Sequence, residues 1–206
     1  MRAARRDAYV GGMIALALGT AVAGCALVAA PETESSKAVL SKLPAEIPRR
    51  EASRITLLLL TPEAKPIYDT TQMAYSLRPY EVAYFRNHEW GATPAQMLQP
   101  LLVSTLEQTG YLRAILTPPY AGSYSYSLRT EIVEFVQDFA SDPAALRLLL
   151  RLRLSDDATG RLVATREISL REPMQQKSPS AGVVAANEAT AKALQEIARF
   201  VLEKAD

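Results

Sequence analysis

A strict two-residue alternation between residues 146 and 154 is the strongest constraint on how this chain can fold. Every second residue in this stretch is leucine, and three of the four residues between the leucines are arginine. A period of two places alternate side chains on opposite faces of a β-strand, so one face of this strand is entirely apolar. The leucines are Leu146, Leu148, Leu150, Leu152 and Leu154, and they alternate with Arg147, Leu149, Arg151 and Arg153.

A turn and a return strand follow this apolar strand. Residues 156–160 read Asp-Asp-Ala-Thr-Gly, and two acidic residues there are better explained by turn chemistry than by a metal site. The return strand alternates as well, with Leu162, Ala164, Ile168 and Leu170 on one face and Thr165, Glu167 and Ser169 on the other. We expect a β-hairpin in which Arg151 or Arg153 faces Glu167, a cross-strand pair that contributes a few tenths to about 1 kcal/mol.

A helix is predicted from its capping residues. Thr93, Pro94 and Gln96 form a capping box ahead of leucines at helical spacing, and Gly110 is placed where the helix should end. Pro100 lies inside this segment, so we expect it to kink the helix or to shift its start.

The remaining elements complete an α+β pattern. A second helix should begin at Ser178-Pro179-Ser180 and run to about Lys204, with an apolar stripe of Val184, Ala191, Leu194, Ile197, Ala198 and Val201. Short apolar or aromatic runs predict further strands at 55–60, 72–77, 80–85, 112–116 and 124–139. We expect one α+β domain with a mostly antiparallel or mixed sheet.

The first twenty-five residues differ in composition from the rest of the chain. Arginines open the segment, a largely apolar run follows from Tyr9 to Ala23, and small residues precede Cys25. This is the layout of a secretory signal peptide, whereas a membrane-spanning helix needs about 20 apolar residues. Val22-Ala23-Gly24-Cys25 resembles the lipobox of bacterial lipoproteins. That resemblance implies cleavage between Gly24 and Cys25, and a diacylglycerol and an N-acyl chain on Cys25.

Residues 25–53 are predicted to form the acylated cysteine and a flexible tether. The segment is rich in Ala, Glu, Ser, Lys and Pro and shows no sustained apolar period. We therefore expect a signal peptide at 1–24, a tether at 25–53 and one folded domain at 54–206. Lipoproteins that stay in the inner membrane usually carry Asp after the cysteine. Ala26 occupies that position here, which implies the periplasmic face of the outer membrane.

Charge and reactive residues exclude several classes of function. The formal net charge is +1, and it falls to about −1 without the first 24 residues, so a nucleic-acid partner is not expected. Cys25 is the only cysteine and His88 the only histidine, which excludes an intramolecular disulfide and a His/Cys zinc site within one chain. Residues 86–89 read as a solvated loop, so His88 is not expected to act as a general base. We predict a non-enzymatic protein without a cofactor or metal.

Aromatic residues are candidates for a surface that contacts a partner, because Tyr and Trp are over-represented at interfaces. Trp90 and Tyr84 flank predicted regular elements, and for them a place in the core with the hydroxyl at its rim is the favoured interpretation. Tyr120, Tyr124 and Tyr126 lie in a segment flanked by Pro, Gly and Ser. For these three tyrosines, core and partner surface remain equally open.

The order of these elements resembles the ABC-type transport auxiliary lipoprotein family. The resemblance covers roughly residues 55–202 and is carried by the order of several short motifs and not by a single one. The matching positions are Tyr68-Asp69, residues 80–85, Trp90, Thr93-Pro94 leading to Met97-Leu98, Leu106, Gly110, Tyr111, Asn187 and Ala191. The long segment before Ile55 and Pro100 depart from the family pattern.

The resemblance implies both a fold and a set of partners. The fold is a sheet with two main helices packed on one face. The partners are an MCE-domain protein and the permease and ATPase of an ABC transporter, which together move phospholipid or related lipids between two membranes, with a homo-oligomer also open. Two alternatives remain open, namely a periplasmic shuttle that carries lipid in its own cavity and an assembly lipoprotein of another envelope complex.

Overall fold

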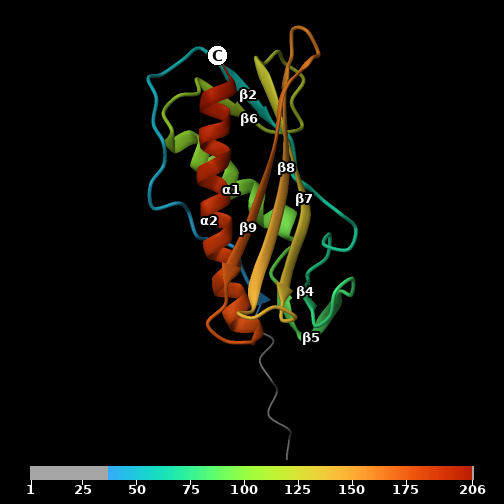
Figure 1. Ribbon diagram of the computed structural model, residues 1–206. Coiled ribbons are helices and arrows are strands. Elements are labelled where there is room, and N and C mark those ends of the chain that lie inside the picture. Colours follow the sequence, from blue (N-terminus) through green and yellow to red (C-terminus); the bar gives the residue numbers. More distant parts are fainter. Residues whose placement is uncertain (1–36, 206) are drawn as a thin grey trace, which may run out of the picture. The chain divides into compact units, whose positions relative to one another are not determined.

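The sheet of this protein is organised around β7 (Tyr126–Asp138), its longest strand (Figure 1). The computed structural model describes residues 37–205. The other strands are β1 (Lys37–Ala38), β2 (Thr56–Leu59), β3 (Glu63–Ala64), β4 (Gln72–Ser76), β5 (Ala83–Trp90), β6 (Ala114–Leu116), β8 (Ala145–Asp156) and β9 (Leu162–Pro173). The two helices are α1 (Pro94–Gln108) and α2 (Pro179–Lys204).

The two edges of β7 have different neighbours. On one edge β8 pairs antiparallel with β7 from end to end, and β9 continues this meander. On the other edge β2, β3 and β4 pair with β7 one after another, all of them parallel to it. β6 extends the sheet beyond β2, and β5 and β1 extend it beyond β4. The predicted mixed sheet is confirmed, and β7 joins its antiparallel and parallel parts.

The predicted hairpin corresponds to β8 and β9. Leu150 is paired with Ile168, and Arg151 with Glu167, as the alternation requires. The guanidinium of Arg151 lies 2.9 Å from the Glu167 carboxylate and 3.1 Å from that of Glu131 on β7. The three side chains therefore form a charged ladder across β7, β8 and β9. It lies on the face opposite the buried leucines, because strand neighbours alternate between faces.

The hairpin turn uses its acidic residues as turn chemistry predicts. The Asp156 carboxylate accepts hydrogen bonds from the hydroxyl and the backbone N–H of Thr159, both at 2.8 Å. These two hydrogen bonds hold the pKa of Asp156 below its usual value. Gly160 has φ +64°, a conformation that glycine adopts without strain.

A β-bulge in β7 changes which side chains face the helices. The register against β8 shifts between Ile132 and Glu134. Before the bulge, even-numbered residues such as Ile132 face the helices, and after it odd-numbered residues such as Phe135 do so. Because of this shift, Glu134 and Asp138 are on the opposite face of the sheet.

Both helices begin at the predicted caps. The Thr93 hydroxyl accepts from the Gln96 N–H, and the Gln96 side chain accepts from the Thr93 N–H, which confirms the capping box. α1 begins at Pro94 and continues through Pro100, which is exposed, so of the two expected effects of Pro100 the shift of the helix start does not occur. Ser178 caps α2. The buried stripe of α2 includes the predicted residues except Val184, which is exposed.

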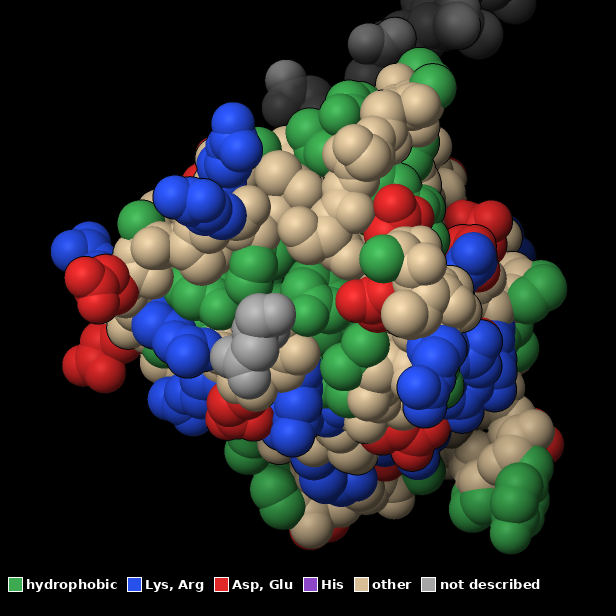
Figure 2. Space-filling model, turned by 90° about the horizontal axis from the view of Figure 1, so that it is seen from above, with side chains coloured by type: hydrophobic (Ala, Val, Ile, Leu, Met, Phe, Trp, Pro, Cys, Tyr) green, Lys and Arg blue, Asp and Glu red, His purple; other side chains and the backbone are tan. Residues whose placement is uncertain are grey.

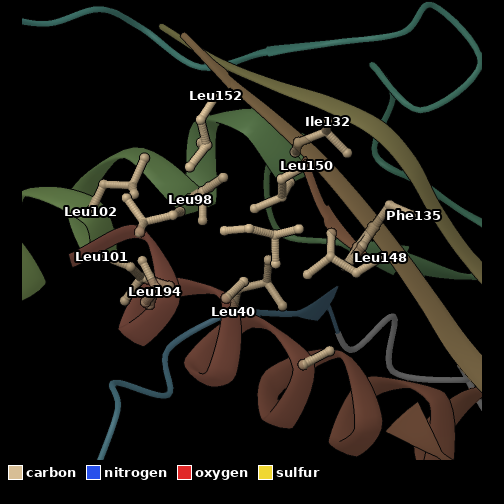
Figure 3. Packing of buried hydrophobic residues seen from close by; sticks show 14 of the residues in the cluster. Leu40, Leu98, Leu101, Leu102, Ile132, Phe135, Leu148, Leu150, Leu152 and Leu194 are labelled. Atoms are coloured by element: carbon tan, nitrogen blue, oxygen red, sulfur yellow. The ribbon is translucent and has the colours of Figure 1, made fainter. Parts of the chain in front are cut away.

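The core fills the space between one face of the sheet and the two helices. Figure 3 shows leucines of α1 and α2 facing leucines of β8 and the side chains of Ile132 and Phe135 on β7. Leu102, Leu106, Leu150, Leu152 and Leu194 are fully buried there. The predicted placement of both helices on one face of the sheet is confirmed. Buried apolar side chains fill the interface between the helices and the sheet.

The tether predicted at 25–53 is wrong from residue 37 onward, because residues 37–53 form an arm that packs along α2. Leu40 lies in the core (Figure 3). The Asn187 side chain of α2 accepts from the N–H groups of Ser41 and Lys42, at 2.9 and 3.1 Å, and donates to the Val39 carbonyl. These hydrogen bonds hold residues 39–42 against α2, although this segment forms neither a helix nor a strand. Residues 25–36 lie outside the described residues.

The arm is also held at the far end of α2. The Arg50 guanidinium donates to the Leu202 carbonyl at 2.6 Å and lies 5.0 Å from the centre of the Tyr111 ring. A cation beside the last carbonyls of a helix is stabilised by the helix dipole. The folded domain therefore begins at about residue 37 and not at residue 54.

The strand predicted at 80–85 is displaced toward the C-terminus. β5 runs from Ala83 to Trp90, and residues 86–89, predicted as a loop, belong to it. Tyr80 instead lies in the preceding turn with φ 66° and is fully exposed. The polar residues of β5 are compatible with a strand because it lies near the edge of the sheet, where only the two-residue β1 covers it.

Candidate functional site

The predicted lipidation site, Gly24 and Cys25, lies outside the described residues. Its cleavage and its acyl chains therefore remain predictions from the sequence.

Two of the candidate aromatic residues belong to the interior. Trp90 is 2% exposed and its ring centre lies 5.4 Å from that of Phe135, so its proposed role in partner binding is wrong. Tyr84 is half-buried, and its hydroxyl donates to the Ile67 carbonyl at 2.9 Å. Both residues agree with the favoured interpretation. Trp90 buries its ring in the core, and Tyr84 lies at the rim, where its hydroxyl has a hydrogen-bond partner.

The remaining three tyrosines lie at the end of the domain where β7 begins. Tyr120 is 44% exposed, and Tyr124 and Tyr126 are half-buried. This segment contacts the β8–β9 turn, since the Asp157 N–H donates to the Ser125 carbonyl at 3.0 Å. A hydrogen bond to the Asp157 carboxylate raises the pKa of Tyr124. The segment 120–126 and the hairpin turn therefore form one surface.

Basic side chains gather at the same end. Arg54 and Arg113 lie on adjacent segments, because the Arg113 N–H donates to the Ile55 carbonyl at 2.8 Å, and both are exposed. Arg161 is exposed in the hairpin turn, which contacts the segment before β7 at this end of the domain. Seen along the long axis, this end presents more basic than acidic side chains around an apolar centre (Figure 2). We call Arg54, Arg113, Arg161, Tyr120 and Tyr124 the arginine–tyrosine end.

Sequence reasoning found the tyrosines of this end but missed its arginines. They are far apart in the chain and meet because Thr56 at the start of β2 pairs with both β6 and the segment before β7. Arginine together with tyrosine is the composition of protein interfaces, since both combine large contact area with polar groups. The arrangement suits contact with an acidic surface.

The part of the chain that the structure describes contains no group of side chains that could hold a metal ion, since no three His, Cys, Asp or Glu side chains in residues 37–205 lie close enough together. His88 projects from β5, with its ring centre 5.9 Å from that of Phe85. Neither helix in this part of the chain is long and apolar enough to cross a membrane.

Comparison with known families identifies the chain. The ABC-type transport auxiliary lipoprotein component matches residues 39–198, most of the described domain. The chain belongs to this family. The matched region begins inside the arm, in agreement with the arm being part of the folded unit. No curated protein sequence matches the chain.

Solved structures share the fold of this auxiliary lipoprotein. Protein XCC0632 from Xanthomonas campestris is 19% identical and superimposes with a TM-score of 0.73, over 81% of this chain and 94% of that one. An uncharacterized protein is 18% identical, with a TM-score of 0.63 over 81% of this chain and 99% of the other. At these identities the two structures establish the fold alone. The family establishes an envelope-associated lipoprotein that accompanies an ABC transport system.

Proposed function

We propose that this protein is a periplasmic lipoprotein of the outer membrane and a non-enzymatic subunit of a lipid-transport system. Its partners would be an MCE-domain protein and the permease and ATPase of an ABC transporter. The observation that carries the proposal is the family match over residues 39–198. The lipobox at Val22-Ala23-Gly24-Cys25 supports the anchor, and Ala26 supports the outer membrane.

A docking role agrees with the interior of the domain better than a shuttle role. A shuttle would need an apolar cavity for acyl chains, whereas fully buried leucines fill the space between helices and sheet (Figure 3). Permanent acylation also opposes shuttling, because each buried methylene adds about 0.8 kcal/mol to membrane binding. The protein therefore acts by holding a binding surface at a fixed place.

The anchor sets how far that surface extends from the membrane. Lys37 lies twelve positions after Cys25, and a fully extended chain of that length spans at most roughly 40 Å. The described part of the chain begins with β1, which lies beside the first turn of α2. The arginine–tyrosine end lies at the other end of the long strands from β1.

Replacing the lipidated residue tests the anchor. We expect Cys25→Ser to leave uncleaved precursor or unacylated protein outside the outer-membrane fraction, with loss of transport activity. Membrane fractionation and mass spectrometry of the N-terminal peptide measure both effects. Full transport activity from a variant without acyl chains would contradict the proposal.

Charge reversal tests the docking surface. We expect the double variant Arg54→Glu, Arg113→Glu to bind the MCE-domain partner at least tenfold more weakly, because two exposed charges would then repel an acidic partner surface. Affinity measured at two salt concentrations should show a smaller salt dependence than in the wild type. Arg78→Glu is the matched control, since Arg78 is exposed in the β4–β5 turn at the opposite end. Unchanged affinity of the double variant would remove this surface from the proposal.

A further inference from the structure

Two large apolar side chains are exposed in the turn that joins β4 to β5. This turn consists of residues 77–82, and we call it the β4–β5 turn. Leu77 is 62% exposed, and Tyr80 is fully exposed. Pro79, which lies between them in the sequence, is exposed as well. Large apolar side chains that are grouped on a surface mark a site of interaction, because leaving them in water is unfavourable.

The shape of the turn is fixed, but its exposed ring contributes nothing to the packing of the domain. The Ser76 hydroxyl donates to the Arg78 carbonyl at 2.8 Å. Tyr80 has φ 66°, which is costly for a residue with a side chain and which glycine would adopt without strain. Within residues 37–205, the Tyr80 side chain forms no hydrogen bond and no ring contact. Contacts within the domain therefore do not explain why a tyrosine occupies this position.

The composition of the turn suits the boundary between water and lipid. Arg78 and Glu81 are its only charged residues, and they form an ion pair at 3.9 Å. Because these two charges compensate each other, the turn can approach lipid without carrying an unpaired charge there. The other four residues are Leu77, Pro79, Tyr80 and Val82. Tyrosine is enriched where a membrane meets water, and arginine keeps its guanidinium in the polar layer while its stem lies on apolar surface.

The turn lies on the side from which the chain enters the fold. Figure 1 shows β4 and β5 at the end of the long strands where α2 begins. Lys37 is paired with Glu89, and Glu89 with Gln72 at the start of β4. Lys37 is therefore roughly 13 Å from Ser76 along the strand direction, at about 3.3 Å for each of four residues. β1 runs parallel to β5 and away from the turn, so the chain enters β1 from the side of the turn.

We infer that the β4–β5 turn inserts Leu77 and Tyr80 into the headgroup region of the bilayer that holds the lipid anchor. This inference rests on the proposed anchor at Cys25, which is at most roughly 40 Å of extended chain from Lys37. It adds a second membrane contact, which fixes the orientation of the domain. Two apolar side chains bind a membrane weakly by themselves, but the anchor makes their contact intramolecular and so raises the effective concentration of lipid at the turn.

The test places a tryptophan in the turn of the acylated mature protein. The variant Leu77→Trp is reconstituted in vesicles of phosphatidylethanolamine and phosphatidylglycerol, with and without brominated acyl chains. The wild type supplies the baseline, since its single tryptophan, Trp90, is buried. We expect brominated lipid to quench about half of the emission that Leu77→Trp adds, because a side chain at the boundary of headgroups and acyl chains contacts the bromine atoms. Adding Tyr80→Gly, which fits φ 66° and removes the ring, should lower this quenching about twofold, since half of the inserted apolar surface is lost.

An equally exposed leucine at the far end of the sheet is the matched control. Leu162 is 57% exposed and lies level with Ser127, whereas the turn follows Ser76, which is paired with Asp138. The two leucines are therefore roughly 35 Å apart along the strands, at about 3.3 Å per residue. One bilayer surface cannot contact both ends at once, so we expect the emission of Leu162→Trp to be unquenched.

Three results would overturn the inference. The first is vesicle-bound protein in which Leu77→Trp is unquenched, and this result leaves the proposed anchor intact. The second is equal quenching at positions 77 and 162, which would show a domain without a fixed orientation. The third is a blue shift of Leu77→Trp that grows with the number of protein molecules per vesicle but not with brominated lipid, which would assign the turn to contact between two copies of this chain. Failure of the acylated protein to float with the vesicles would instead contradict the anchor, and the inference with it.

Discussion

Replacing Gly182 with alanine is expected to destabilise the domain by about 3 kcal/mol, although alanine favours a helix. A Cβ atom at position 182 would lie 2.0 Å from the side-chain Cδ of Gln137, which real atoms do not tolerate. Gln137 is 1% exposed and cannot move aside, so overpacking outweighs the gain of about 1 kcal/mol in helix propensity. Urea-induced unfolding followed by circular dichroism measures the loss, which corresponds to a Tm lower by roughly 6–12 °C.

The sign of this effect identifies its cause. Helix propensity alone would make Gly182→Ala more stable than the wild type, and that outcome would show that α2 does not approach β7 so closely. The double variant Gln137→Ala, Gly182→Ala removes the obstructing side chain. We expect it to be more stable than the sum of the single effects predicts, since residues in contact do not act additively. Removing Gln137 also removes two buried amide atoms that lack hydrogen-bond partners.

Truncating Leu150 to alanine is expected to cost about 4 kcal/mol. Leu150 is fully buried at the centre of β8 and packs toward both helices (Figure 3). Loss of its methyl groups removes buried apolar surface and leaves a cavity among neighbours that are themselves fixed. The same urea unfolding measurement reports the change in the free energy of unfolding.

The neighbouring residue supplies the control for Leu150. Leu149→Ala is the same chemical change one position away, on the half-buried outer face of β8. We expect Leu149→Ala to cost less than about 1.5 kcal/mol, because little buried surface is lost. Equal costs at the two positions would contradict the alternation in which Leu150 faces the core and Leu149 faces the outer, charged side of the sheet.

The elements predicted correctly are those whose signals are local. The period of two in β8, the capping box at Thr93 and the N-cap at Ser178 each depend on residues that are close together in the sequence. The hairpin pattern predicted that Arg151 or Arg153 faces Glu167, and the register of the two strands selects Arg151. Val184 was misassigned because the helical stripe alone does not show where the sheet ends.

The arm was missed because its stabilising contacts are distant in sequence. Asn187 and Leu202 hold residues that precede them by 145 to 152 positions. A segment rich in Ala, Ser and Pro has no hydrophobic periodicity from which such contacts could be predicted, and its composition resembles that of a linker. Asn187 was noted only as part of a family pattern, and the structure gives it a physical role.

Charged residues on the outer face of β7 and β8 show the same limit. Glu134, Asp138 and Arg147 are brought together by the β7–β8 register, which the hairpin connection at 139–144 fixes. Tyr68 joins them from the loop before β4, which no local signal connects to β7. The one indication in the sequence was the presence of acidic residues in a largely apolar strand, because buried charged residues rarely lack a partner.

The position of β7 in the sheet also affects how the chain matures. β2, β3 and β4 depend on β7 for their parallel pairing, yet about 50 residues separate Ser76 from Tyr126. At roughly 5–20 residues per second, a growing polypeptide leaves these strands with open edges for several seconds. Open strand edges invite association with other chains. Until β7 emerges, the edges of β2, β3 and β4 that pair with it therefore stay open to association with other chains.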